Sequence, residues 1–405
     1  MSATMTLFAV VVIAFVVLSA RAGRAYVSAP MVFMVAGFVF GSTALYDVAG
    51  SSIKAIAEAT LALLLFHGAA ELQPRELRTE SLMTGRLLLI ALPVAMVGTF
   101  LLVRLLFPAM EVWLAVVLAA ALAPTDSALS AATVLNPTVP ERIRRVLNLE
   151  SGLNDGLATP VVLFAIAAAA GTSGGPENSH GALRAVLAVA IGVAFGSLTG
   201  LATGRALRTA RRRGWAEDNL VPLAVLAVPL LCYYGADVLG GNGFMAAFVA
   251  GVTYATTHPS TDQAVPDLEL TRLTSAFLGC AAWMLFGAAT ATHLSALVHW
   301  QTVVVAVASL TVLRMAPVAL SLTGSGLDLR SLLFLGWFGP RGLPSVVFAL
   351  IANDALAGQP GAATVVATIA ATVVLSVLAH GLTAPPLSAA YGDWVRRRAP
   401  VTERS

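Results

Sequence analysis

Two acidic residues inside long apolar stretches are where this sequence could do chemistry. Asp126 follows Pro124 in the apolar stretch 112–135, and Asp155 lies in the apolar stretch 147–170. A carboxylate so deep in a bilayer is costly, and such residues are functional candidates by default. Pro124 lacks an N–H and obstructs a helical hydrogen bond, so it frees carbonyl oxygens beside Asp126. Freed carbonyl oxygens and a carboxylate together suit a dehydrated monovalent cation.

The stretch around Asp155 carries three more polar side chains at helical spacing. Ser151 lies one turn before Asp155 on the same face, and Glu150 and Asn154 form a second pair on the neighbouring face. Two carboxylates that share a low-dielectric site raise each other's proton affinity. Such a site can hold a proton or a cation, each weakening the other, which is the physical basis of antiport. The structural alternatives are a kink proline beside a wet cavity and a polar contact between helices.

A buried arginine provides the opposite charge. Arg314 lies inside the apolar stretch 302–322, and a buried guanidinium needs an anion. If Glu150 cancels Arg314, Asp126 and Asp155 remain for a transported ion. The alternative is that Arg314 extends to a membrane surface.

The composition is that of a membrane protein. Of the 405 residues, 58 % are apolar and 11 % are charged, whereas soluble domains carry about 25 % charged residues. This composition excludes a soluble enzyme and a disordered chain, and the apolar stretches lack the alternation of a membrane β-barrel. We expect an all-α polytopic membrane protein with about 13 transmembrane helices. They are predicted at residues 5–20, 29–45, 53–72, 82–107, 112–135, 147–170, 183–207, 220–239, 243–256, 273–292, 302–322, 331–352 and 362–387.

The positive charges predict the orientation of these helices. Of the 24 Lys and Arg residues, 18 fall in alternate loops and the C-terminal tail, and three fall on the opposite side. Positive charge favours the cytoplasmic side. We therefore expect an inner or plasma membrane protein with its N-terminus outside and its C-terminus in the cytoplasm.

Glycine and proline interrupt two helices at corresponding positions. Thirteen helices fit two inverted six-helix repeats, helices 1–6 and 8–13, the plan of many secondary transporters. Helix 5 contains Pro124, and its counterpart helix 12 contains Gly339 and Pro340 just before Arg341. We expect both helices to be discontinuous at the site. Arg341 could offset the negative C-terminal end of a half-helix or extend to a membrane surface.

Taken together and in order, these motifs resemble those of the monovalent cation:proton antiporters, in the NhaP/NHE branch. The resemblance covers nearly the whole chain, and the set of motifs on the expected helices is highly specific. It rests on Pro124-Thr125-Asp126, Glu150-Ser151-x-x-Asn154-Asp155, the mid-helix Arg314 and Gly339-Pro340-Arg341-Gly342.

The resemblance implies a role for each of these residues. Asp155 would be the main carrier of cation and proton, and the site would be completed by Asp126, Ser151 and the main-chain carbonyl of Thr125. Charge balance and bracing would come from four others: Glu150 paired with Arg314, Asn154 at the crossing of the broken helices, and Arg341. An Asn-Asp pair in place of Asp-Asp resembles the electroneutral branch.

The resemblance also implies a homodimer built from one transmembrane exchanger domain, residues 1–392, with a short basic cytoplasmic tail at 393–405. A core of helices 4–6 and 11–13, about residues 82–170 and 302–387, would move against a dimer domain. That domain would comprise helices 1–3 and 8–10, about residues 5–72 and 220–292.

The sequence thus predicts a secondary antiporter that exchanges Na⁺ or Li⁺ for H⁺ without a cofactor, with membrane lipids and no nucleic acid as partners. K⁺/H⁺ exchange on the same fold is the nearest alternative, because no list of side chains separates the two cations. A non-transporting sensor or a cation channel with this fold is another alternative. An intramembrane enzyme is disfavoured, because no His-Glu-x-x-His motif occurs and no histidine stands near Ser151 in the sequence.

Overall fold

The computed structural model describes residues 2–41, 50–72, 79–126, 129, 133, 136–171, 179–257, 266–291 and 294–398. Within these residues the regular structure is entirely helical, so the expected all-α fold is confirmed. The helices are α1 (Ser2–Arg24), α2 (Ala29–Gly41), α3 (Gly50–Ala70), α5 (Ser81–Arg86), η1 (Leu87–Ala91), α6 (Leu92–Leu106), α7 (Val112–Ala121), α9 (Glu141–Ala169), α10 (Ser179–Arg212), α11 (Val221–Val238), α12 (Gly243–Thr257), η2 (Pro266–Leu268), α13 (Glu269–Ala291), α14 (Leu294–Leu297), α15 (Trp300–Leu310), α16 (Val312–Ser321), α17 (Leu329–Trp337), α18 (Leu343–Ala355) and α19 (Ala362–Arg398).

The helices agree with the predicted membrane spans. In the described part of the chain, 9 helical segments are long and apolar enough to cross a membrane. Shorter apolar helices are α2, α7, α12 and α18. Each of the predicted stretches overlaps one of these segments. Two of the short helices, α7 and α18, belong to the stretches that Pro124 and Pro340 were expected to interrupt.

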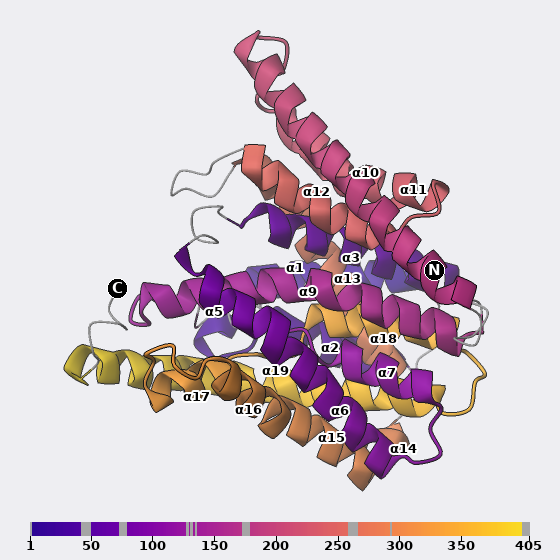
Figure 1. Ribbon diagram of the computed structural model, residues 1–405, viewed down its shortest axis with the longest axis vertical. Coiled ribbons are helices and arrows are strands. Elements are labelled where there is room, and N and C mark those ends of the chain that lie inside the picture. The colour runs from indigo at the N-terminus through magenta and orange to yellow at the C-terminus, as the bar shows by residue number, and fades with distance from the viewer. Residues whose placement is uncertain are drawn as a thin grey trace.

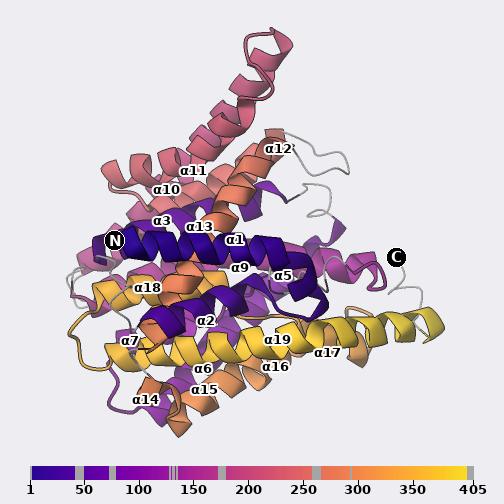
Figure 2. The ribbon, with the colours of Figure 1, turned by 180° about the vertical axis from the view of Figure 1, so that it is seen from behind.

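The helices form one bundle with α9 near its centre (Figure 1). On one side α9 packs against α3 and α12, and on the other against α7 and α18. In the view from behind, α1 and α2 lie nearest the viewer, across the other helices (Figure 2). The start of α1 and the end of α19 lie at opposite ends of the bundle in both views, as an odd number of spans requires.

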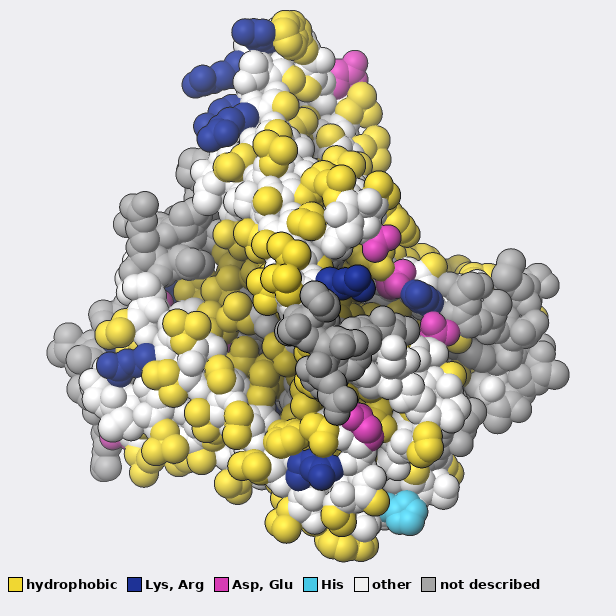
Figure 3. All heavy atoms as spheres, turned by 45° about the vertical axis from the view of Figure 1, so that its right-hand side comes forward, with side chains coloured by type: hydrophobic (Ala, Val, Ile, Leu, Met, Phe, Trp, Pro, Cys, Tyr) yellow, Lys and Arg dark blue, Asp and Glu magenta, His cyan; other side chains and the backbone are white. Residues whose placement is uncertain are grey.

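The outer surface is largely apolar, as a lipid-facing surface must be. Figure 3 shows many hydrophobic side chains across the face in view, and several Lys and Arg side chains at the protruding end of the molecule, with others elsewhere on this face. That end is where α10 turns into α11, and its basic residues include Arg208, Arg212 and Arg213. The spans were predicted from apolar stretches with positive charges at their ends. The surface has the same pattern.

Two helices are broken, and their own residues account for the breaks. The first break follows α7 and contains Pro124, which cannot donate a helical hydrogen bond. The second separates α17 from α18 and contains Gly339, Pro340 and Gly342. A Cβ on Gly342 would collide with the carboxylate of Asp126, so glycine alone lets the two broken segments approach each other.

Three features differ from the sequence prediction. Helix 4 contains the π-helical turn η1 just before Pro93; in membrane helices such a local adjustment can re-satisfy the backbone groups that proline frees. Helix 11 is interrupted at Thr311, whose φ and ψ of −115° and −96° separate α15 from α16. Finally, α19 continues to Arg398, so residues 393–398 of the predicted tail extend the last helix.

Candidate functional site

The two broken segments meet at Asp126. Its main-chain N–H donates to the carbonyl oxygen of Pro340 at 2.9 Å. Its carboxylate Oδ2 accepts a hydrogen bond from the N–H of Leu343, the first residue of α18, at 2.8 Å. The carboxylate therefore lies at the positive N-terminal end of α18, which stabilises its negative charge. Asp126 is thus fixed by the second broken helix through both its main chain and its side chain.

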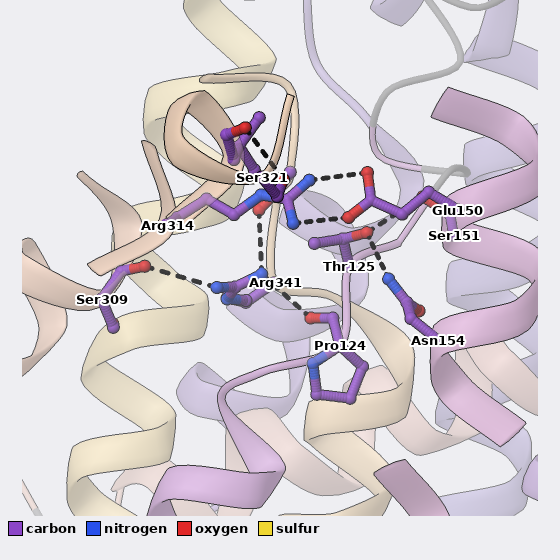
Figure 4. Close-up of polar contacts among 11 residues, drawn as sticks. Pro124, Thr125, Glu150, Ser151, Asn154, Ser309, Arg314, Ser321 and Arg341 are labelled. Carbon is purple, nitrogen blue, oxygen red and sulfur yellow. Dashed lines mark hydrogen bonds and ion pairs between the residues drawn. The ribbon is translucent and has the colours of Figure 1, made fainter. Parts of the chain in front are cut away.

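Arg341 lies in the same crossing and donates to three main-chain carbonyls. The acceptors are Pro124 at 3.2 Å, Gly339 at 3.2 Å and Ser309 at 3.3 Å. Figure 4 shows the guanidinium between Ser309 and Pro124. Ser309 lies in the last turn of α15, and Pro124 and Gly339 follow the C-terminal ends of α7 and α17, where helix dipoles are negative. The side chain is 1 % exposed, so it offsets three helix ends inside the protein and does not extend to a membrane surface.

The interruption at Thr311 has its explanation here. In a continuous helix the carbonyl of Ser309 would accept the N–H of Leu313. The break frees this carbonyl, and Arg341 then supplies the donor. The residues next to Thr311 are neither glycine nor proline, and the nearest proline, Pro317, lies inside α16, so the local sequence did not predict a break at Thr311.

Glu150 on α9 and Arg314 on α16 form a buried ion pair. Arg314 donates to both carboxylate oxygens of Glu150, at 2.5 and 2.7 Å. Both side chains are 3 % exposed. Two parallel charge-assisted hydrogen bonds are the strongest geometry for such a pair. The pairing that the sequence analysis expected is therefore present, and the two charges cancel.

Thr125 joins the first broken segment to α9. Its hydroxyl Oγ1 lies 3.1 Å from Oγ of Ser151 and accepts a hydrogen bond from Nδ2 of Asn154 at 2.7 Å (Figure 4). All three side chains are buried. Asn154 therefore has the bracing geometry expected of it, and the contact runs through the threonine hydroxyl. Ser345 on α18 adds a further brace by donating to the carbonyl of Ala121 at 2.7 Å.

Asp155 is the central residue of the 29-residue helix α9. Its side chain is 9 % exposed. Among the described residues, its buried Oδ1 has no hydrogen-bond partner, and neither has the buried Oδ1 of Asn154 next to it. Asp126 is the charged group that acts electrostatically on Asp155. A buried acceptor without a donor, beside a second carboxylate, has the chemistry to hold a proton or a cation.

A glycine beside Asp155 brings α9 close to its neighbour. A Cβ on Gly156 would lie 2.5 Å from ring carbons of Phe248 on α12. The absence of a side chain at Gly156 lets α9 pack closely on α12 beside Asp155.

A cavity of about 520 Å³ reaches Asp126. It is bordered by the connection from α1 to α2, by α13 around Cys280, and by α19 around Gly381. Asp126 is the one charged side chain among the described residues that line it. The cavity therefore joins the α1–α2 connection, α13 and α19 to the crossing of the two breaks.

Sequence reasoning gathered the residues of this site but missed part of their support. The eight candidate polar residues and the helix breaks Pro124, Gly339 and Pro340 all lie at or beside the crossing of the two breaks. It did not identify Ser309 and Ser345, because an isolated serine in an apolar helix carries no signal of the partner it meets.

Comparisons with known proteins agree with this geometry. Residues 10–390 match the family model described as "Sodium/hydrogen exchanger, transmembrane". A curated Na⁺/H⁺ antiporter from Schizosaccharomyces pombe is 27 % identical over 267 residues, which are 61 % of this chain and 55 % of that protein. The match therefore spans about half the length of this relative.

The fold is also similar to that of solved structures. The sodium proton antiporter MjNhaP1 from Methanocaldococcus jannaschii at pH 8 superposes with a TM-score of 0.77 at 18 % identity, covering 96 % of this chain and 98 % of that one. A structure of the same antiporter from an electron microscopy map gives a TM-score of 0.75 at 17 % identity and covers 98 % of each chain. At this identity the similarity concerns the fold.

Proposed function

Because the chain belongs to the sodium/hydrogen exchanger family of transmembrane proteins, we propose that it exchanges Na⁺, and Li⁺, for H⁺ across the membrane with Asp155 as the shared carrier. The observation that carries the proposal is the buried, unpartnered Oδ1 of Asp155 within the field of Asp126. Na⁺ would be held by Asp155 and Asp126, with oxygens from Ser151 and the main chain of Thr125. A proton on Asp155 would remove the charge that binds the cation.

The charges at the crossing favour exchange of one cation for one proton. The buried groups there are the carboxylates of Asp126, Glu150 and Asp155 and the guanidinium groups of Arg314 and Arg341. With every group ionised, one negative charge is left over. One monovalent cation or one proton neutralises it, so the loaded forms carry equal charge. An electroneutral cycle follows from this balance.

The same balance explains why the two ion movements are coupled. A site with an unneutralised charge is poorly solvated inside the protein and is costly to move through the bilayer. We propose that only the cation-loaded and proton-loaded forms cross, by alternating access. A core of helices 4–6 and 11–13 would move against helices 1–3 and 8–10 in a homodimer. The cavity that reaches Asp126 would then be the cytoplasmic entrance, with the C-terminus on that side.

Dissipation of a proton gradient in everted vesicles that lack other antiporters tests the function. Addition of Na⁺ or Li⁺ should collapse the proton gradient. The rate of collapse should be the same whether or not valinomycin and K⁺ clamp the membrane potential. A rate that depends on potential would overturn the one-for-one stoichiometry. If the gradient collapses on addition of K⁺ but not of Na⁺, the transported cation is K⁺. If it collapses with none of Na⁺, Li⁺ and K⁺, the proposed exchange is wrong.

A further inference from the structure

Two buried side chains on α19 replace a hydrogen bond that the break in helix 12 removes. In a continuous helix the N–H of Arg341 would donate to the carbonyl of Trp337, four residues earlier. The break separates these groups, and the N–H of Arg341 donates instead to Oγ of Ser376 at 2.6 Å. Ser376 and His380 are 0 % and 1 % exposed, so bulk water does not satisfy the separated groups.

His380 connects Ser376 to the other end of the break. Its Nε2 lies 2.9 Å from the carbonyl oxygen of Trp337, and because a carbonyl only accepts, Nε2 carries a proton in this contact. Its Nδ1 lies 3.3 Å from Oγ and 2.9 Å from the carbonyl oxygen of Ser376. Nδ1 accepts from the hydroxyl when the ring is neutral and donates to the carbonyl when it is protonated. The Nε2–H bond to Trp337 holds in both forms.

Residues of α19 also contact the indole ring of Trp337. The indole Nε1 donates to Oγ1 of Thr383 at 3.1 Å, and the imidazole of His380 lies against the indole with ring centroids 5.0 Å apart. Ser376, His380 and Thr383 follow one another at four and three residues, so they share one face of α19. This face therefore contacts both ends of the break in helix 12.

We propose that Ser376 and His380 are positioning residues for cation–proton exchange, which hold the break of helix 12 in the geometry that the cation site requires. This inference rests on the proposed function. Neither residue touches the cation in this arrangement. They act on the segment from Trp337 to Arg341.

The held segment provides two of the contacts that shape the site. Its Pro340 carbonyl receives the N–H of Asp126, and the guanidinium of Arg341 bonds the carbonyl of Pro124. Without the bridge through Ser376 and His380, the N–H of Arg341 loses its acceptor, and the carbonyl of Trp337 keeps only the N–H of Gly339, at 2.8 Å. The segment then shifts toward other partners, and Asp126 moves with it.

The charged groups whose fields reach His380 are Arg341, in the break, and Arg314, on α16. Because the Nε2–H bond does not depend on the charge of the ring, a glutamine whose amide nitrogen donates in the same place should serve. The role proposed for His380 therefore requires a hydrogen-bond donor at this position and does not require a group that titrates.

The test compares variants that remove the bridge with variants that keep it. Ser376→Ala and His380→Leu remove the hydroxyl and the donor, whereas Ser376→Thr and His380→Gln retain them. Thr372→Ala is the matched control, because Thr372 is a buried hydroxyl on the same helix that donates within α19, to the carbonyl of Thr368 at 2.8 Å. Each purified variant is examined by amide hydrogen exchange of the peptide covering residues 338–343 and by Na⁺-driven proton movement in liposomes.

The two bridge-removing variants should speed amide exchange in this peptide and raise the half-saturating Na⁺ concentration, each by roughly tenfold for a lost buried hydrogen bond. Ser376→Thr, His380→Gln and Thr372→Ala should stay near the wild type in both measurements. The pH profile of His380→Gln should match that of the wild type.

Amide exchange that is unchanged in Ser376→Ala and His380→Leu would overturn the bridge. Faster amide exchange with unaltered Na⁺ dependence would overturn the positioning role, as would a shifted pH profile in His380→Gln. A wild-type protein that moves no ions, with the amide exchange effects present, would instead overturn the proposed function and leave the bridge standing.

Discussion

The main-chain N–H of Asp126 and the carbonyl oxygen of Pro340, 214 residues apart in the sequence numbering, join the two broken helices with a 2.9 Å hydrogen bond. This bond places a carboxylate of one break at the N-terminus of the helix that follows the other. The site is therefore made by the crossing itself, and its geometry depends on the shape of both breaks.

Substitution of Gly342 by alanine should inactivate the protein without unfolding it. The added Cβ would collide with the carboxylate of Asp126, so the crossing must open. A misplacement of about 1 Å in a reacting geometry can lower a rate roughly 100-fold, and we expect a loss of that order in Na⁺/H⁺ exchange. Gly85→Ala is the control, because no described atom lies within 4 Å of its Cβ position. Exchange by Gly342→Ala at the rate of Gly85→Ala would contradict the crossing geometry.

Removal of one partner of the Glu150–Arg314 pair should destabilise the protein more than removal of both. A lone charge left in the interior costs about 3–5 kcal/mol, whereas replacement of both partners by groups of similar volume is often neutral. Thermal unfolding in detergent of Glu150→Gln, Arg314→Met and the double variant forms the required cycle. The double variant should be more stable than either single variant. Additive losses would show that the two charges do not cancel each other.

Modification of Cys280 should block exchange from one side of the membrane. Cys280 lines the cavity that reaches Asp126 and is half-buried. The chain contains 2 cysteines, and the other, Cys232, is 0 % exposed. A charged, impermeant methanethiosulfonate reagent applied to the cytoplasmic face should therefore inhibit the wild type and leave Cys280→Ser active. Equal sensitivity of the two proteins would exclude this cavity as the route.

Much of this molecule follows from the sequence, because the bilayer restricts what an apolar chain can do. Long apolar stretches had to be helices. Proline alone did not decide where they break, because Pro160 and Pro229 lie inside continuous helices, whereas Pro124 and Pro340 stand beside an acidic residue or glycines and lie at the breaks. Charge balance made Glu150 a possible partner of Arg314, and the family resemblance implied the pair, which the structure shows across 164 positions of the sequence.

The features that the sequence did not predict depend on neighbouring helices. The break at Thr311 occurs together with the hydrogen bond from Arg341 to the carbonyl of Ser309, and the residues next to Thr311 do not signal either feature. Ser376 and His380 were likewise absent from the candidate site. Serine and histidine in an apolar helix are commonly packing residues, and the groups they satisfy become visible only when the break between α17 and α18 is placed beside α19.

The most direct test of the account is Na⁺/H⁺ exchange by Asp155→Asn in liposomes, with Asp237→Asn as the control because Asp237 is an exposed carboxylate on α11. The amide fills the same space but carries neither a proton to exchange nor a negative charge to bind Na⁺. The account predicts no exchange by Asp155→Asn and full exchange by Asp237→Asn. In the wild type, the half-saturating Na⁺ concentration should rise as the pH falls. Exchange by Asp155→Asn at the wild-type rate would contradict the assignment of Asp155 as the shared carrier.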